Sequence, residues 1–503
     1  MRGKRILAAV FSGLMLLLGF LCFFAGKWYL FSFGGQSVNA ILFTLFSGIG
    51  GVEKSQVVNF VRFPLLCTVL MTAALLLFFC QSGRVHLNLI LKKSGRRICL
   101  SPLRSKAMVL VSLLICLVMT LWGAFSIGLP QWLFDLAHVS TIYEEHYAAP
   151  QEVSVTFPEQ KRNLIYIYLE SMETTFFSKE QGGSMDECVI PELYDLAAEN
   201  TNFSGTDQVG GWGYMSGGTW TTAGIVSQSG GIPLLLPFGG NNGDKMTRVL
   251  PGTMLLWDIL AEQGYYQTMM MGSDKNFSGQ QNLLEQHHMD AVYDYNSAIA
   301  DGFIPPDYWE WWGMGDEKLY AYARQELTRI SQMGKPFNFT MITIDTHFPD
   351  GFQCGLCGGK YAEQYENVFA CASAQLGGFL QWLEQQPFYE NTTVVICGDH
   401  LSMDREYMVR NGLENAPRWV YNCIVNEAPG LSAEHTKNRL FMPVDMFPTT
   451  LAALGCRIEG EQLGLGVNLY SGVPTLAEEM GVDKLNQELT RSTLPYLFRF
   501  LLD

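Results

Sequence analysis

The stretch NLIYIYLE, residues 163–170, decides the fold, because a seven-residue strand pattern runs directly into a carboxylate, Glu170. The stretch TTVVICGDH, residues 392–400, repeats this layout and ends on Asp399 and His400. Open α/β sheets bind their ligands at the carboxyl ends of strands. The two strands therefore present three candidate metal ligands.

Strand and helix patterns alternate from residue 161 onward, which predicts an α/β fold with a mostly parallel central sheet flanked by helices. Further strands are predicted at 265–271, 338–345 and 419–425, and helices at 190–200, 254–264 and 363–386.

Three segments without charged residues, 6–26, 63–83 and 107–130, are candidate membrane spans. Each is long enough, since a transmembrane helix needs about 20 apolar residues. The first does not read as a cleavable signal peptide, because two more spans follow it. Residues 39–52 are shorter and interrupted by glycines, and we expect them at the membrane interface.

Charge is divided unevenly along the chain. Residues 1–129 contain 13 Lys and Arg against the single acid Glu53, whereas residues 130–503 contain 20 basic and 47 acidic side chains. Short basic loops stay cytoplasmic, so we expect a multi-pass protein of the inner (cytoplasmic) membrane with everything after Pro130 on the outer side. The acidic outer part argues against nucleic acid as a partner.

These observations predict that the chain is divided into four parts. Residues 1–130 form a membrane domain with three transmembrane helices and an interfacial segment, and residues 131–160 form a juxtamembrane linker. Residues 161–475 form an extracytoplasmic catalytic domain, large enough to bury one sizeable core. Residues 476–503 form a C-terminal extension.

Seven of the 12 cysteines lie in the outer part, where oxidising conditions would let some of them pair. Cys354 and Cys357 stand in a glycine-rich loop, GFQCGLCGGKY, and we expect a disulfide that involves this loop, with free or metal-bound thiols as the alternative. Its partner cannot be determined from the sequence. A structural zinc site would want a second such pair, which the sequence lacks.

The segment GGWGYMSGGTWTTAGIVSQSGGIP, residues 210–233, supplies candidate nucleophiles. Thr219, Thr221 and Thr222 stand just before an apolar helical turn, where backbone amides and the helix dipole favour anionic groups. Helix capping is the ordinary role of threonine at such a boundary, so this pattern alone leaves both roles open.

Five motifs in this order resemble the membrane-anchored phosphoglycerol transferases, which include lipoteichoic acid synthases and the enzymes that decorate periplasmic glucans. These enzymes belong to the alkaline phosphatase and sulfatase superfamily, and the resemblance covers about residues 160–470. It implies a sulfatase-like catalytic domain. The motifs are YLESMETTFF, GGTWTTAGIVSQSGGIPL, DTHFPDGF, VVICGDHLSMD and VDMFPTTLAALG.

The resemblance implies a role for each residue at a matching position. Glu170, Asp399, His400 and Thr221 would bind one divalent metal, and Thr221 would be the catalytic nucleophile, with Thr219 or Thr222 as alternatives. His347 would bind the substrate. The metal would be Mn²⁺, with Mg²⁺ or Zn²⁺ as alternatives that suit the same ligand types.

The implied reaction transfers phosphoglycerol from phosphatidylglycerol to an envelope glycan or polyglycerolphosphate acceptor. It would pass through a phosphoglyceryl-enzyme intermediate and release diacylglycerol. Lipoteichoic acid synthases have an arginine near the position of Gln280, and its absence here leaves the acceptor open.

Other functions remain open. The chain could be a phosphoethanolamine transferase, but those enzymes use further histidines, and here only His347 is well placed. It could be a sulfatase-like hydrolase, although sulfatases need a Cys or Ser at the position of Thr221. A membrane sensor without enzyme activity would lack one of the ligands. His287 and His288 are expected at the surface, with a place in the substrate cleft as the alternative.

Overall fold

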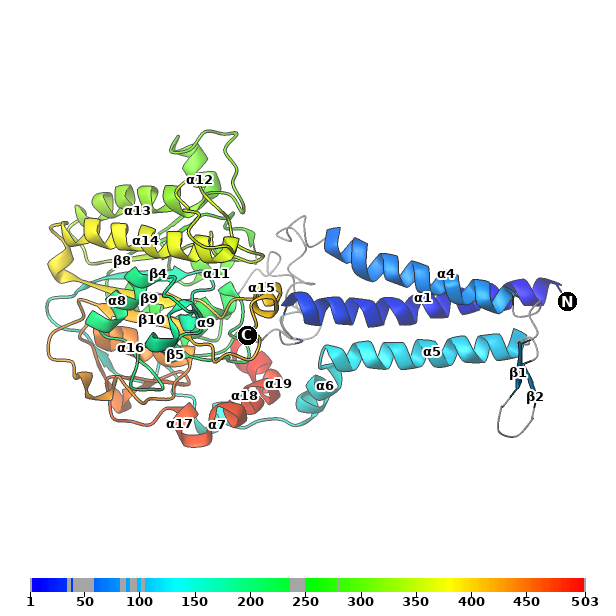
Figure 1. The fold of residues 1–503 in the computed structure, drawn as a ribbon. Coiled ribbons are helices and arrows are strands. Elements are labelled where there is room, and N and C mark those ends of the chain that lie inside the picture. The colour runs from blue at the N-terminus through cyan, green and yellow to red at the C-terminus, as the bar shows by residue number, and fades with distance from the viewer. Residues whose placement is uncertain are drawn as a thin grey trace. The chain divides into compact units, whose positions relative to one another are not determined.

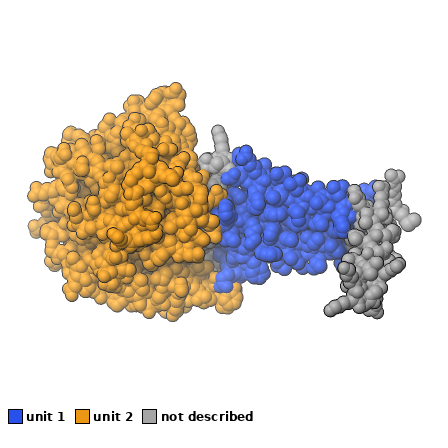
Figure 2. All heavy atoms as spheres, viewed as in Figure 1, with its two compact units in different colours: residues 1–38, 52–133 blue, residues 39–51, 134–503 orange. Residues whose placement is uncertain are grey.

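The computed structural model describes residues 2–33, 38, 58–81, 87–90, 97–100, 105–235, 249–277 and 280–501. These residues form two compact units, which Figure 2 colours separately. The first unit comprises residues 1–38 and 52–133, and the second comprises residues 39–51 and 134–503. The interfacial segment expected at 39–52 lies outside the described residues, as does most of the basic loop between the second and third spans.

Three helices of the first unit are long and apolar enough to cross a membrane, with candidate spans at Ile6–Ser32, Val58–Phe79 and Ser105–Ser126. The first and third spans lie in α1 (Arg2–Phe33) and α5 (Ser105–Ser126). The second begins with a π-helical turn, Val61–Leu65, and continues as α4 (Leu66–Gln81). Between α4 and α5, β1 (Leu87–Ile90) pairs with β2 (Arg97–Leu100) in an antiparallel hairpin.

Helices α1 and α5 pack closely through small residues. A Cβ atom at Gly123 of α5 would lie 2.4 Å from the carbonyl oxygen of Cys22 in α1. Because lipid tails are as apolar as the helices, close contact between backbones is a main source of helix association in a membrane. Gly123 therefore permits the approach of α1 and α5.

A seven-stranded sheet forms the centre of the second unit, in the order β5-β10-β9-β4-β8-β6-β7 (Figure 1). The strands from β9 to β7 run parallel, and β10 and β5 pair antiparallel at one edge. The predicted mostly parallel sheet is therefore confirmed. The strands are β4 (Asn163–Leu169), β5 (Gly211–Trp212), β6 (Tyr266–Met271), β7 (Ala291–Tyr293), β8 (Phe337–Ile342), β9 (Thr392–Gly398) and β10 (Val420–Val425).

Helices cover both faces of this sheet, because successive strand residues point to opposite sides. On one face Tyr166 and Tyr168 of β4 share a core with α9 (Thr221–Gly230), α10 (Leu256–Glu262) and α16 (Met446–Ala453). On the other, Ile165 and Ile167 share a core with α8 (Pro191–Glu199), α13 (Asp316–Ser331) and α14 (Gln364–Glu384).

The remaining elements are short or peripheral. They are α6 (Leu129–Ala137), α7 (Ile142–Glu145), β3 (Val155–Thr156), α11 (Gln280–Gln286), α12 (Tyr295–Ala300), α15 (Arg405–Arg410), β11 (Arg457–Ile458), β12 (Gln462–Leu463), β13 (Gly466–Val467), α17 (Leu476–Met480), α18 (Val482–Arg491), α19 (Thr493–Tyr496) and a final π-helical turn, Leu497–Leu501.

The segments that we expected as a linker and a C-terminal extension pack against each other. Tyr143 of α7 is buried, and its ring meets Phe500 edge to face with 5.1 Å between the ring centroids. Arg491 of α18 pairs with Asp135 at 3.1 Å. The linker strand β3 also pairs with β11, in the predicted catalytic domain. Both segments therefore contribute to the core of the second unit.

The expected disulfide in the loop 352–361 is wrong for this structure. Cys354 and Cys357 are free thiols whose sulfur atoms lie 3.6 Å apart, whereas a disulfide bond is about 2.05 Å long. The sulfur of Cys371, on α14, lies 3.7 Å from that of Cys354. The loop and the helix thus bring three thiols together, which sequence spacing did not reveal.

Candidate active site

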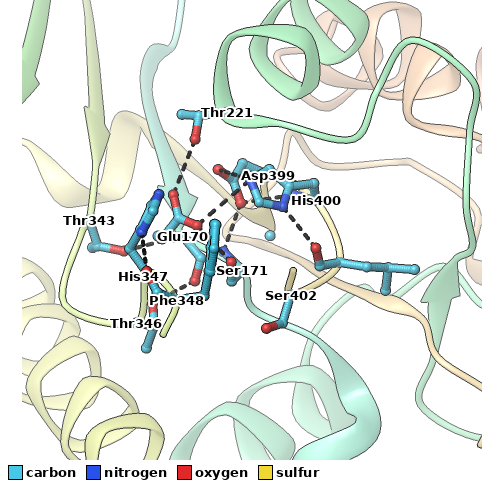
Figure 3. A network of polar contacts seen from close by, with 12 residues as sticks. Glu170, Ser171, Thr221, Thr343, Thr346, His347, Phe348, Asp399, His400 and Ser402 are labelled. Atoms are coloured by element: carbon cyan, nitrogen blue, oxygen red, sulfur yellow. Dashed lines mark hydrogen bonds and ion pairs between the residues drawn. The ribbon is translucent and has the colours of Figure 1, made fainter. Parts of the chain in front are cut away.

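Two parallel neighbouring strands bring the predicted carboxylates together (Figure 3). Leu169 at the end of β4 pairs with Gly398 at the end of β9, so Glu170 and Asp399 follow at the same edge of the sheet. The adjacent strand β8 leads to Thr343, whose hydroxyl oxygen accepts the Glu170 N–H at 3.0 Å. The three strand ends therefore fix the position of Glu170.

Glu170, Asp399 and His400 form one buried group. Each offers one candidate ligand atom, and these atoms all lie within 4.8 Å of one another. His400 Nε2 lies 3.3 Å from Asp399 Oδ2 and 3.7 Å from Glu170 Oε1. The three side chains are almost completely excluded from solvent.

The hydrogen bonds of His400 leave its Nε2 atom available to a cation. The ring nitrogen Nδ1 lies 2.9 Å from the carbonyl oxygen of Leu401, which can only accept a proton, so Nδ1 carries the hydrogen. Among the described residues, His400 Nε2 and Asp399 Oδ2 are buried without a hydrogen-bond partner. Buried polar atoms are normally satisfied. Two buried atoms without hydrogen-bond partners, His400 Nε2 and Asp399 Oδ2, therefore fit the ligands of a bound cation.

The electrostatics of the group also fit a cation. Burial, and next the charge of Glu170, raise the pKa of Asp399 to about 7. Burial disfavours the charged form of His400, but the carboxylates of Asp399 and Glu170 outweigh it and raise the His400 pKa. Without a cation these groups therefore retain protons, and a divalent ion would take the place of those protons.

Thr221 lies beside this group. It is the first residue of α9, after Trp220 in extended conformation, and its Oγ1 donates to Glu170 Oε2 at 3.1 Å (Figure 3). The helix approaches β9 closely, because a Cβ atom at Gly224 would lie 2.2 Å from the Asp399 carbonyl oxygen. The glycine thus allows α9 to place Thr221 at the strand ends.

The surroundings of the two neighbouring threonines, Thr219 and Thr222, differ from those of Thr221. Thr222 Oγ1 accepts a hydrogen bond from Gln280 Nε2 at 3.3 Å. Thr219 Oγ1 is buried and has no hydrogen-bond partner in the described parts of the chain. Thr221 is the half-buried threonine of the three, and its hydroxyl contacts Glu170.

His347 follows β8 and lies near the same edge of the sheet. Its neighbour Thr346 donates from Oγ1 to the Glu170 carbonyl oxygen at 2.5 Å. His347 Nδ1 lies 2.7 Å from the carbonyl oxygen of Phe348, and its ring centroid is 4.7 Å from that of Trp312. Trp312 thus forms part of the surroundings of His347.

Ser171 is a residue that the sequence analysis missed. Its N–H donates to Asp399 Oδ1 at 2.8 Å and its hydroxyl donates to Glu170 Oε1 at 2.6 Å. Its φ of 53° is uncommon for a residue other than glycine. The sequence did offer a signal, because Ser171 directly follows the strand-end carboxylate Glu170. A residue next to a candidate metal ligand can hold that ligand in position.

An ion pair between the half-buried Arg418 and the buried Glu173 was missed as well. The guanidinium of Arg418 donates to Glu173, from Nε to Oε1 at 2.9 Å. Glu173 Oε2 also accepts the N–H of Ser402 at 3.0 Å, in the segment that follows His400. The two partners are 245 positions apart, so no local pattern could reveal them.

Asp316 and Asp345 form a second buried carboxyl pair. Asp316 accepts the N–H groups of Ile344 at 2.8 Å and Asp345 at 3.2 Å, and Asp345 Oδ1 accepts the Asp316 N–H at 3.2 Å. Burial, and next the charge of Asp316, raise the pKa of Asp345 to about 9. Burial raises the pKa of Asp316 to about 7. The pair therefore retains a proton at neutral pH.

The surface position expected for His287 is wrong. Its side chain is buried, and Nδ1 lies 2.7 Å from Asp258 Oδ2. His288 is exposed, as expected. The sequence pattern could not separate two adjacent histidines at the end of α11, because their contacts depend on α10.

Comparison with known proteins gives a family match over most of the second unit. The family model described as Sulfatase matches residues 162–456. Phosphoglycerol transferase I of Escherichia coli is 32% identical over 263 residues, which are 50% of this chain and 33% of that protein. The enzyme of the same name from Shigella boydii gives the same values. The match thus spans only a third of the length of these relatives.

One solved structure agrees with the fold of the second unit. A protein in the alkaline phosphatase superfamily from Vibrio parahaemolyticus has a TM-score of 0.50 at 19% identity, and the match covers 69% of this chain and 80% of that one. The lipoteichoic acid synthase LtaP from Listeria monocytogenes has a TM-score of 0.48 at 18% identity, with 69% and 95% covered.

Proposed function

Because this chain belongs to the sulfatase family, we propose that it is a membrane-anchored phosphoglycerol transferase with Thr221 as its nucleophile. The donor would be phosphatidylglycerol, and the acceptor a hydroxyl group of an envelope glycan or of polyglycerolphosphate. The curated relatives called phosphoglycerol transferase I support this reaction class. The three apolar helices would keep the catalytic domain next to a lipid donor.

One observation carries the proposal. The Thr221 hydroxyl lies 3.1 Å from Glu170 Oε2, at the first turn of α9 and beside the buried group Glu170, Asp399 and His400. A nucleophile beside candidate metal ligands is the arrangement that transfer through a covalent intermediate requires. In the part of the chain that the structure describes, neither Thr219 nor Thr222 donates a hydrogen bond to Glu170.

Glu170, Asp399, His400 and Thr221 would hold one divalent ion, for which Mn²⁺ is our first choice. A divalent ion in such a site supplies positive charge to a phosphoryl oxygen and makes a nearby hydroxyl more acidic. Ser171 would orient two of these ligands, since it donates to both Glu170 and Asp399.

In the first step, Thr221 Oγ1 would pass its proton to Glu170 Oε2, to which it donates, and form a bond to the phosphorus of the lipid headgroup. The bond between that phosphorus and the diacylglycerol oxygen breaks, and the leaving oxygen takes up a proton. His347 is the proposed donor of that proton. Its Nδ1 contacts the Phe348 carbonyl oxygen, so the proton would come from Nε2. Thr221 is left carrying phosphoglycerol.

In the second step, an acceptor hydroxyl attacks the same phosphorus and breaks its bond to Thr221 Oγ1. Thr221 would take its proton back from Glu170 Oε2. His347 Nε2, now without its proton, would take the proton of the acceptor.

The test uses the full chain, purified in detergent and exposed to phosphatidylglycerol without an acceptor. Peptide mass spectrometry should find a phosphoglycerol adduct on Thr221. Thr221→Ala should bind metal but form no adduct, while Thr219→Ala and Thr222→Ala should still form it. Phosphatidylethanolamine, offered to the same protein, should leave no adduct.

Each other outcome has a definite meaning. An adduct on Thr219 or Thr222 would mean that this threonine is the nucleophile, and the proposed reaction would stand. A phosphoethanolamine adduct in place of phosphoglycerol would change the donor. Product formation at the normal rate by Thr221→Ala would overturn the covalent route.

A further inference from the structure

Three cysteines of the second unit form a cluster. This cluster shares no residue with the candidate metal ligands Glu170, Asp399 and His400. Cys354 and Cys357 lie in the loop before α14, and Cys371 lies on α14 itself. Their sulfur atoms are all within 4.8 Å of one another. Cys371 is buried and the other two are half-buried.

The spacing of the sulfur atoms fits a tetrahedral metal ion. Cys354 Sγ lies 3.6 Å from Cys357 Sγ and 3.7 Å from Cys371 Sγ. Sulfur ligands at about 2.3 Å from a zinc ion at tetrahedral angles stand about 3.8 Å apart. The observed distances are close to that value and far from the length of a disulfide bond, which is about 2.05 Å.

The loop has the hydrogen bonds of a thiolate-binding turn. The Cys357 N–H donates to the Cys354 carbonyl oxygen at 3.2 Å, and the Leu356 N–H donates to Cys354 Sγ at 3.4 Å. The spacing of Cys354 and Cys357 is the two-residue separation common in structural zinc sites. A backbone donor to sulfur stabilises the thiolate, which is the form that binds metal.

A second donor reaches the sulfur atom on the helix. Gln375, one turn after Cys371 on α14, donates from Nε2 to Cys371 Sγ at 3.3 Å. Side chains that donate to a metal ligand orient it and spread its charge.

We propose that Cys354, Cys357 and Cys371 bind a zinc ion, at a site separate from Glu170, Asp399 and His400. Three thiolates fill three positions of the tetrahedral ion, and a water molecule fills the fourth, on the side where the loop faces solvent. Each thiol releases its proton as it binds.

This ion would fasten the loop to α14. The loop begins just after His347, and the Phe352 N–H donates to the Asp345 carbonyl oxygen at 2.7 Å. A link from Cys354 and Cys357 to the buried Cys371 therefore restrains the chain that leads away from the candidate site.

The test measures zinc in the full chain, purified in detergent with a reductant and without a chelator. Cys371→Ser and Cys354→Ser should each contain one equivalent of zinc less per chain than the parent. Cys188→Ser is the matched control, because Cys188 is a half-buried thiol outside the cluster. The control should keep the zinc content of the parent.

A second measurement separates the two candidate metal sites. Asp399→Ala should still take up one Co²⁺ per chain and show the near-ultraviolet charge-transfer absorption of thiolate bound to Co²⁺. Cys354→Ser combined with Asp399→Ala should lose that absorption. Cys354 lies in the loop, so its substitution is the safer one for folding, and the melting temperature of each variant checks this.

Two results would overturn the zinc site. One is an unchanged zinc content in a folded Cys354→Ser or Cys371→Ser variant. The other is a disulfide between two of the three cysteines, found by peptide mass spectrometry of chain isolated from cells without reductant.

Discussion

The raised pKa of the buried Asp345 makes stability depend on pH. The Asp345 pKa is raised to about 9 by burial and by Asp316, whereas an aspartate in an unfolded chain has a pKa of about 3.9. A group whose pKa is raised by folding contributes its full stabilisation at pH values below its pKa in the unfolded chain. This stabilisation is lost as the pH rises toward 9. The loss is at most about 1.4 kcal/mol per pH unit for one group.

Asp345→Asn should therefore flatten the decline in stability between pH 6 and pH 9. The asparagine cannot ionise, but its carbonyl oxygen can still accept the Asp316 N–H. The measurement is the melting temperature of the full chain at several pH values. Glu317→Gln is the control, because that carboxylate is exposed and next to Asp316 in sequence. Equal slopes for Asp345→Asn and the parent would mean that Asp345 is ionised when buried.

The contact between α9 and β9 decides whether Thr221 reaches the strand ends. Gly224 has room for no side chain, since a Cβ atom would lie 2.2 Å from the Asp399 carbonyl oxygen. Alanine at this position must push the helix away from the strand. Displacement of a reacting group by about 1 Å can reduce turnover by about 100-fold.

We expect Gly224→Ala to reduce phosphoglycerol transfer from labelled phosphatidylglycerol by about 100-fold. Gly378→Ala on α14 is the matched control, because a Cβ atom there would meet nothing within 4 Å. That variant should keep its turnover and gain up to about 1 kcal/mol in stability from the better helix propensity of alanine. Parental turnover in Gly224→Ala would show that the position of α9 is not critical.

The proposed reaction requires the second unit to lie on the outer side of the membrane. The Lys and Arg residues before and between the spans predict this orientation. A thiol reagent that cannot cross membranes should label Asp186→Cys in intact spheroplasts above the background of the parent chain, since Asp186 is almost fully exposed.

The same reagent should label Lys93→Cys, in the basic loop, only after the membrane is made permeable. Lys93 lies outside the described residues, and this position tests topology alone. Labelling of Lys93→Cys but not Asp186→Cys in intact spheroplasts would reverse the orientation and exclude a donor in the outer leaflet.

Chain-local patterns determined the architecture of this protein. The apolar runs that end on Glu170 and Asp399 predicted the strands β4 and β9, and long uncharged runs predicted three helices that are long and apolar enough to cross a membrane. Such patterns are reliable because burial on a sheet face or in lipid selects residues at regular spacing along one segment. They also placed Glu170, Asp399 and His400 at one edge, since parallel strands end together.

Contacts between distant segments were decided only by the tertiary structure. The sequence offered three adjacent threonines, and the approach of α9 to β9 set Thr221 against Glu170. It offered two cysteines in a loop, and the packing of α14 added Cys371. The linker and the C-terminal segment also became part of the core through mutual packing. These outcomes depend on how elements pack in three dimensions, and residue order along one segment carries little information about that packing.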